Sequence, residues 1–218
     1  MTSIDHDNRA AAIDAILARA PVLPVLAIER LDDAVPLARA LVDGGLPVLE
    51  VTLRTPAALA AITRITAEVR GAVVGAGTVL SPADLDAVAA AGAAFAISPG
   101  ATQALYTAAE GQRMPWIPAI ATASELMRGL DHGHRRFKFF PAEAAGGVAA
   151  LNAFAGPFPQ ARFCPTGGID ATSALRYRAL PNVMTVGGSW MVPREAIEAR
   201  DWQRITALAR ASCATRPL

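Results

Sequence analysis

Lysine is nearly absent from this sequence: Lys138 is the only lysine among 20 basic residues, and all the others are arginine. A genome that favours arginine codons would explain the imbalance. A lysine that is retained despite such a bias has a chemistry that arginine lacks. Arginine stays protonated in any protein setting, whereas a lysine amine can lose its proton and attack a carbonyl carbon. Lys138 stands in the run RFKFFPAE, where burial among phenylalanines would penalise the charged ammonium form. The composition therefore favours a lysine that forms a Schiff base.

Charge and aromatic residues are also scarce. Charged residues make up 18% of the chain, the net charge is +1, aromatic residues make up 6%, and no basic run exceeds Arg135-Arg136. A protein that binds nucleic acid needs a basic patch or stripe, and base stacking needs aromatic residues among the basic ones. Both are missing, so we expect a small-molecule partner and no nucleic acid.

Cysteine is represented twice, by Cys164 and Cys213, without the spacing of metal ligands. Two free thiols in a reducing cytoplasm are the preferred interpretation, and one disulfide stays open as the alternative.

The first 20 residues lack a basic region followed by an apolar core, so they do not resemble a secretory signal. Residues 87–109 carry no charge, but Ser98-Pro99-Gly100 interrupts them. We therefore expect two elements joined by a turn rather than a membrane span, and a cytoplasmic protein.

Short apolar runs alternate with alanine-rich amphipathic segments along the whole chain, which predicts an α/β protein. The predicted strands are residues 22–28, 48–53, 73–79, 95–98, 116–121, 136–140, 162–165 and 184–186. The predicted helices are residues 32–42, 56–69, 82–91, 102–109, 123–130, 148–154 and 171–178, with further helices near 10–19 and 202–212. Eight strand-then-helix units predict a single-domain (β/α)8 TIM barrel over residues 1–218, with an extra N-terminal helix. An open doubly wound sheet is the alternative, but the turn after the first strand has no glycine-rich phosphate loop.

Helix starts are marked by hydroxyl residues before proline. Thr55-Pro56 and Ser81-Pro82 each place a capping side chain before a proline suited to the first helical position. Both pairs are therefore predicted to begin helices.

Two predicted strands carry charged residues on one face. In VLEVTLRT, Glu50, Thr52 and Arg54 share one parity and point to the same side. In RFKFF, Lys138 can meet Glu50 if both face the interior of the barrel. One interpretation is a structural ion pair between Glu50 and Arg54, with Lys138 also structural. The functional interpretation makes Glu50 a general acid and base, and Arg54 an anchor for a substrate carboxylate.

Glycine pairs end the last two predicted strands, in CPTGGI and VGGSW. The loops after strands seven and eight are the usual phosphate site of such barrels, so Gly167-Gly168 and Gly187-Gly188, with Ser189, predict a phosphorylated ligand.

Asp131, His132 and His134 could form a metal cluster, but they stand at the end of the barrel that serves stability, and we expect no metal. Cys164 is predicted to be a small core residue rather than a nucleophile.

The runs LEVTLRT, VGAGTVL, FAISPG, RFKFFPAE, RFCPTGGI and VGGSW resemble those of the bacterial 2-keto-3-deoxy-6-phosphogluconate (KDPG) aldolases, from about residue 21 to residue 210. These are class I aldolases of the Entner–Doudoroff pathway. The resemblance implies a trimeric (β/α)8 barrel without a metal or other cofactor. It also implies cleavage of the substrate to pyruvate and glyceraldehyde 3-phosphate.

The same resemblance assigns roles residue by residue. Lys138 would form the Schiff base and Glu50 would move protons. Arg54 and Thr78 would hold the pyruvate carboxylate, Pro99 would lie at the edge of the site, and Thr166 would set the stereochemical preference. The phosphate would bind Gly167, Gly168, Gly188 and Ser189. A sibling aldolase for the galactonate epimer or for 4-hydroxy-2-oxoglutarate is the nearest alternative. A phosphosugar isomerase without covalent catalysis and a non-catalytic binding module are more distant ones.

Overall fold

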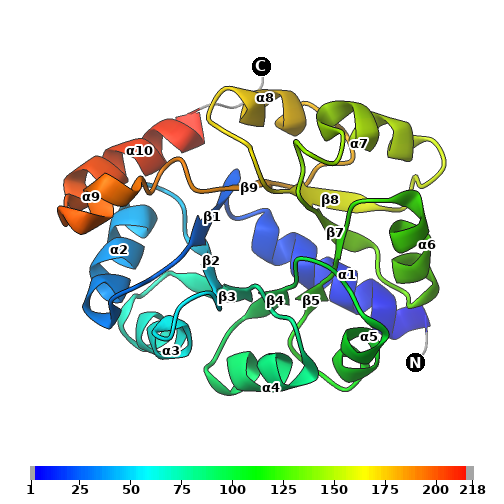
Figure 1. Ribbon diagram of the computed structural model, residues 1–218, viewed down its shortest axis with the longest axis horizontal. Coiled ribbons are helices and arrows are strands. Elements are labelled where there is room, and N and C mark those ends of the chain that lie inside the picture. The colour runs from blue at the N-terminus through cyan, green and yellow to red at the C-terminus, as the bar shows by residue number, and fades with distance from the viewer. Residues whose placement is uncertain (1–2, 215–218) are drawn as a thin grey trace.

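The computed structural model describes residues 3–214, with side chains from residue 8 onward. Strands lie at the centre and helices surround them (Figure 1). The strands are β1 (Val22–Leu26), β2 (Val48–Thr52), β3 (Val73–Gly77), β4 (Phe95–Ile97), β5 (Trp116–Ile117), β6 (Ala119–Ile120), β7 (Arg136–Phe139), β8 (Arg162–Pro165) and β9 (Val186–Gly188). The helices are α1 (Ser3–Leu17), α2 (Leu31–Asp43), α3 (Ala58–Glu68), α4 (Pro82–Ala90), α5 (Gln103–Glu110), α6 (Ala123–Asp131), α7 (Gly147–Ala155), α8 (Ser173–Arg178), α9 (Arg194–Glu198) and α10 (Trp202–Ala214).

The strands pair in parallel as two curved sheets. Within the described residues one sheet has the order β5-β4-β3-β2-β1-β9 and the other the order β6-β7-β8. Only Pro118 separates β5 from β6, and proline has no N–H to give to a ladder, which explains the interruption. Two isolated parallel bridges, Phe163–Val183 and Thr166–Gly187, link the β8 side to the β9 side. The predicted α/β class with a parallel sheet is confirmed.

Burial of both sheet faces explains the apolar character of the strands. All five residues of β2 are buried, as expected when side chains point alternately to the interior and to a surrounding helix. The helices bury one stripe each: α2 turns Ala34, Leu37 and Leu41 toward the strands. Glu50 of β2 and Lys138 of β7 are buried in these strands although their side chains are charged.

Some predicted boundaries were wrong. The last strand is β9, two residues later than predicted, because Gly187 and Gly188 continue the ladder opposite Leu23 and Pro24 instead of forming a turn. The short helix α9 was not predicted. Thr55 does not cap α3, since its hydroxyl donates to the Ile28 carbonyl at 2.6 Å, whereas Ser81 caps α4 as predicted.

The uncharged stretch at residues 87–109 is shared by three elements, not two as expected for it, and Ser98-Pro99-Gly100 separates the last two. Helix α4 ends within it, β4 follows, and α5 begins near its end. No helix in residues 3–214 is long and apolar enough to cross a membrane.

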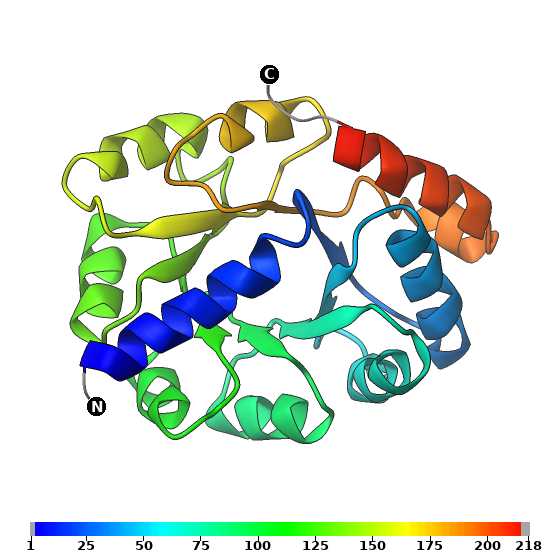
Figure 2. The ribbon, with the colours of Figure 1, turned by 180° about the vertical axis from the view of Figure 1, so that it is seen from behind.

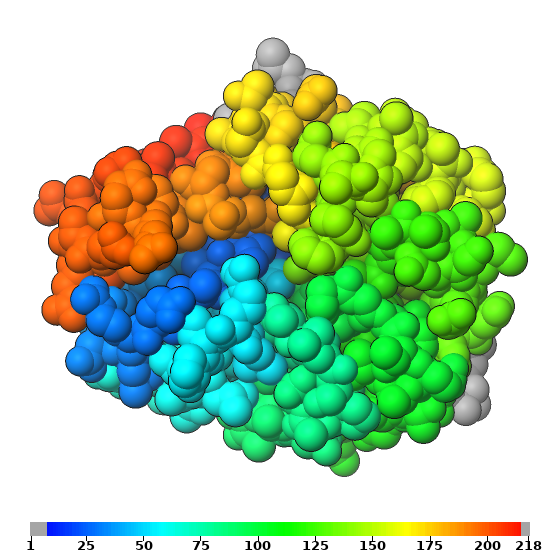
Figure 3. All heavy atoms as spheres, in the orientation of Figure 1, coloured from blue at the N-terminus to red at the C-terminus, as the bar shows by residue number. Residues whose placement is uncertain are grey.

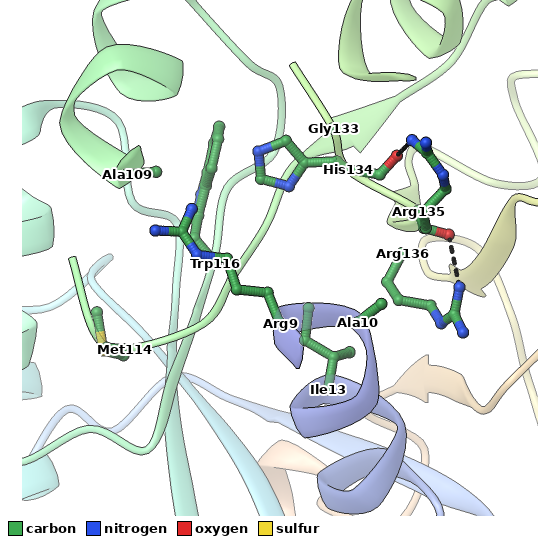
Figure 4. A pocket seen from close by; sticks show the side chains of 10 residues that line it. All are labelled: Arg9, Ala10, Ile13, Ala109, Met114, Trp116, Gly133, His134, Arg135 and Arg136. Carbon is green, nitrogen blue, oxygen red and sulfur yellow. Dashed lines mark hydrogen bonds between the residues drawn. The ribbon is translucent and has the colours of Figure 1, made fainter. Parts of the chain in front are cut away.

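Helix α1 crosses the amino ends of the strands (Figure 2). Asp14 of α1 binds Arg136, the first residue of β7, at 2.5 Å, and Arg9 donates to the Glu110 carbonyl at 2.8 Å. Beside these contacts is a cavity of only about 20 Å³, bounded by Arg9, Trp116 and Arg136 (Figure 4). A space of this size holds about one water molecule. This cavity is therefore too small for a ligand larger than water.

Candidate active site

Lys138 of β7 and Glu50 of β2 meet in the interior of the fold. Lys138 Nζ lies 3.0 Å from Glu50 Oε1, and the two side chains are 7% and 1% exposed. Nζ also lies 5.3 Å from the centre of the Phe140 ring. The strand parity thus brings these two residues together as predicted. The alternative ion pair between Glu50 and Arg54 was wrong.

The second carboxylate oxygen of Glu50 has no partner. Glu50 Oε2 is buried and accepts no hydrogen bond from any residue that the structure describes. Leaving a buried acceptor unsatisfied costs about 1–3 kcal/mol, and more when the group is charged. This oxygen is therefore available to accept a proton or hydrogen bond from a ligand.

Gly77 of β3 makes room for this carboxylate. A Cβ atom at position 77 would overlap Glu50 Oε1 and lie 2.8 Å from both Cγ and Cδ. Gly77 is opposite Thr52 in the β2–β3 ladder, so the Glu50 side chain runs across the glycine toward the carboxyl end of the sheet. The sequence analysis missed this function of Gly77.

Cys164 of β8 is the neighbour of Lys138 in the β7–β8 ladder. It is fully buried, and this burial raises the pKa of its thiol to about 12, with the Glu50 carboxylate adding to the shift and Lys138 opposing it. A thiol that stays protonated is a poor nucleophile. The structure therefore agrees with the prediction that Cys164 is a core residue.

Arg54 lies just beyond the end of β2, on the rim. Its Nε donates to Thr52 Oγ1 at 3.0 Å, and no carboxylate among the described side chains forms an ion pair with it. Arg54 lines a cavity of about 520 Å³ together with Ser189 and Arg30. Figure 3 shows this face hollowed where the segments after β1, β2 and β9 meet. The cavity brings together two residues to which the resemblance gave different ends of a substrate, but neither Lys138 nor Glu50 lines it.

Thr78 and Pro99 follow β3 and β4 at the same rim. Thr78 has a φ of 60°, a left-handed conformation that is uncommon for threonine and that clusters at ligand sites. Next to Pro99, Ser98 is fully buried and its hydroxyl has no partner among the described residues. No hydrogen bond within the described chain joins Thr78 or Pro99 to Lys138 or Glu50.

The loops after β8 and β9 are neighbours because Thr166 and Gly187 form a parallel bridge. Gly167 and Gly168 have φ values of 106° and 77°, which favour glycine. Within the described residues, the amides of Gly167, Gly168 and Ser189 donate no hydrogen bond. Unpaired amides on adjacent glycine loops are typical of phosphate sites.

Glu143 and Tyr177, which the sequence analysis missed, support the first of these loops. The Glu143 amide donates to the Gly167 carbonyl at 3.1 Å, and the Tyr177 hydroxyl donates to Glu143 Oε1 at 2.6 Å. Burial, followed by the bond to Glu143, raises the pKa of Tyr177, so this donor keeps its proton.

The histidines after α6 have packing partners. His132 stacks on Tyr106 with a centroid distance of 4.3 Å, and its Nε2 lies 3.2 Å from Gln103 Oε1. Among the described residues, no group of three or more His, Cys, Asp or Glu side chains could hold a metal ion.

Comparisons with known proteins point to one family. A family model described as "KDPG and KHG aldolase" matches residues 13–208. The KHG/KDPG aldolase of Escherichia coli (strain K12) is 56% identical over 203 residues, which cover 93% of this chain and 95% of that protein.

Two solved structures are similar throughout. The KDPG aldolase of Legionella pneumophila, with pyruvate captured as a covalent carbinolamine intermediate, has 51% identity and a TM-score of 0.90 over 92% of this chain and 98% of its own. The aldolase of Zymomonas mobilis ZM4 with 3-phosphoglycerate has 53% identity and a TM-score of 0.89 over 94% and 96%. With its buried lysine–glutamate pair and this likeness over nearly its full length, the chain belongs to the KDPG and KHG aldolase family.

Proposed function

We propose that this protein is a class I aldolase that cleaves 2-keto-3-deoxy-6-phosphogluconate to pyruvate and D-glyceraldehyde 3-phosphate in the Entner–Doudoroff pathway. The observation that mainly supports this proposal is the buried Lys138–Glu50 pair, in which one carboxylate oxygen has no partner among the described residues. Relatives with 47–56% identity bear the names of this aldolase, which supports the assignment.

Covalent bond formation begins with a proton transfer. Lys138 Nζ and Glu50 Oε1 share a hydrogen bond of 3.0 Å, so a proton can pass to the carboxylate and leave a neutral amine. The amine attacks the C2 ketone of the substrate to give a carbinolamine. Glu50 then protonates the C2 hydroxyl, which leaves as water, and a protonated imine remains on Lys138.

Carbon–carbon cleavage uses the imine as an electron sink. Glu50 takes the proton from the C4 hydroxyl, through a water molecule, and the C3–C4 electron pair moves to form an enamine. The aldehyde leaves, C3 is protonated, and hydrolysis of the imine releases pyruvate and Lys138. Because the imine takes up the electrons, we expect the reaction to need no metal and no other cofactor.

The remaining site residues bind the two ends of the substrate. Arg54 and Thr78 hold the carboxylate, and Pro99 forms the edge of the site. Thr166 contacts the cleaved carbon and sets the epimer preference. The phosphate binds Gly167, Gly168, Gly188 and Ser189. The shared cavity of Arg54 and Ser189 and the unpaired amides of the glycine loops support these roles.

Architecture and assembly are part of the proposal. We infer that the two sheets form one closed (β/α)8 barrel in a single domain over residues 1–218, with β5 and β6 as one strand; the Phe163–Val183 and Thr166–Gly187 bridges support closure. A homotrimer and a cytoplasmic location follow from the family resemblance and the composition, and both stay predictions.

Sibling reactions are the alternative. The E. coli relative is named for KHG as well as KDPG, which favours 4-hydroxy-2-oxoglutarate as a secondary substrate. A comparison of kcat/KM for the gluconate and galactonate epimers and for 4-hydroxy-2-oxoglutarate ranks these activities. A phosphosugar isomerase would cleave none of these three substrates.

Trapping with pyruvate and sodium borohydride tests the mechanism. We expect one reduced pyruvate adduct per chain, located by mass spectrometry on the peptide that contains Lys138. Lys138→Arg is the matched control, because arginine keeps the positive charge beside Glu50 but forms no imine. A folded wild-type protein without an adduct would refute the covalent mechanism.

A further inference from the structure

Thr52 connects the rim arginine to the sheet. Its side chain is buried, with 2% exposure, at the last position of β2. Thr52 Oγ1 donates to the Leu26 carbonyl of β1 at 2.8 Å and accepts from Arg54 Nε at 3.0 Å. The chain of bonds therefore runs from Arg54 through one hydroxyl to the backbone of the neighbouring strand.

The bond to Leu26 fixes the direction of this hydroxyl. A threonine hydroxyl has one proton, so once it donates to Leu26 only its lone pairs can face Arg54. A lone pair matches the guanidinium, which carries donors and no acceptor. Leu26 itself is held in the β1–β2 ladder opposite Val51, so the anchor is part of the sheet.

Arg54 depends on this anchor because little else holds it. The residue is exposed and lies beyond the end of β2, and it forms no ion pair with a described carboxylate. A free arginine on a rim must give up side-chain entropy when it binds a ligand. With Nε held by Thr52, the two terminal nitrogens remain for a bidentate contact with a carboxylate.

We infer that Thr52 is a positioning residue of the aldolase site: its hydroxyl orients Arg54 toward the carboxylate of the substrate. This inference rests on the proposed function, in which Arg54 binds that carboxylate. Thr52 itself does not touch the reacting atoms. Its substitution therefore weakens the binding of pyruvate before it affects the chemistry on Lys138.

Thr55 provides a matched control on the same segment. Its hydroxyl donates to a β1 carbonyl, that of Ile28, at 2.6 Å, and it is 9% exposed. No hydrogen bond in the described chain links Thr55 to Arg54. Thr55→Val thus removes a buried bond to β1 without removing a contact with the arginine.

The experiment measures the pyruvate concentration that gives half-maximal borohydride inactivation, together with kcat and KM for cleavage. For Thr52→Val we expect a rise of about ten-fold in the half-maximal concentration and in KM, with a smaller change in kcat, as for the loss of a hydrogen bond to a charged group. Thr52→Ser, which keeps the hydroxyl, and Thr55→Val should stay within about two-fold of wild type. Thr52→Ala replaces the valine variant if the latter does not fold.

A double-mutant cycle separates positioning from a general structural effect. In the Arg54→Gln background, Thr52→Val should cause no further rise, because the contact is already lost. Three results would each overturn the inference. The half-maximal pyruvate concentration and KM could be unchanged in Thr52→Val, or they could rise equally in Thr55→Val. They could also rise as much on Thr52→Val substitution in the Arg54→Gln background as in wild type. A wild-type protein that forms no pyruvate adduct would instead refute the proposed function, and this inference with it.

Discussion

Gly77→Ala is the sharpest test of the site geometry, because it adds a single methyl group beside Lys138 and Glu50, the proposed catalytic pair. The new Cβ would overlap Glu50 Oε1 and lie 2.8 Å from Cγ and Cδ. Carbon atoms in ordinary contact are about 3.5–4.0 Å apart, so the carboxylate must move by roughly 1 Å. Oε1 is the atom that binds Lys138 at 3.0 Å, and a shift of this size breaks the bond.

The expected cost is about 100-fold in kcat/KM, the effect typical of a 1 Å misplacement of a reacting group. That factor corresponds to about 2.7 kcal/mol of transition-state stabilisation. A steady-state assay of pyruvate release measures it, and circular dichroism checks the fold. The rate of the pyruvate adduct should fall in parallel, since the proton transfer from Lys138 precedes both.

Gly156→Ala is the control for Gly77→Ala. A Cβ at position 156 meets no atom within 4 Å, and its φ of −69° suits any residue. If a folded Gly77→Ala protein kept kcat/KM within two-fold of the Gly156→Ala value, the contact between Lys138 and Glu50 would not be needed for activity. The proposed proton transfer would then be wrong.

Two further predictions concern the interior of the fold. Glu50→Gln should lower kcat by about 10²- to 10⁴-fold, the usual contribution of a general acid and base; a loss below ten-fold in the cleavage assay would remove Glu50 from the proton transfers. Cys164 should stay protonated to about pH 12 in the folded state because burial raises its pKa, whereas an unfolded thiol ionises near pH 9. Its contribution to stability is therefore complete below pH 9 and declines toward pH 12. Denaturant unfolding at pH 8 and pH 11 should show a smaller loss of unfolding free energy in Cys164→Ala than in wild type, and an equal loss would contradict this.

The alternation of side chains along the strands was enough to place Glu50 and Lys138 in the interior. It did not decide the partner of Glu50, because parity alone allows Arg54 as well as a residue on another strand. The structure supplies the reason for the outcome: β2 ends at Thr52, so Arg54 lies in the following turn, where its Nε donates to Thr52 Oγ1 instead of pairing with Glu50. Lys138 is 88 positions away in sequence but reaches Glu50 across the interior.

Other features depend on contacts that no local pattern contains. Gly77 ends β3 and looks like an ordinary strand-end glycine; only the path of the Glu50 side chain makes it necessary. Thr52 shares the parity of Glu50, which was a usable signal, but its bond to Leu26 required the β1–β2 register. Gly187 and Gly188 favoured a turn in the sequence, yet pairing with β1 keeps them extended.

The cost of the Lys138–Glu50 pair argues that the fold keeps it for chemistry rather than for stability. Removing two charges from water is expensive, and a buried ion pair is often no more stabilising than apolar residues of the same volume. The interior is otherwise suited to such residues, since Phe95, Ile97 and Ile117 are fully or almost fully buried. A pair selected for stability would also satisfy both carboxylate oxygens, whereas Glu50 Oε2 has no partner in the described chain. In the proposed mechanism, the same unsatisfied oxygen would pass protons to and from a bound substrate.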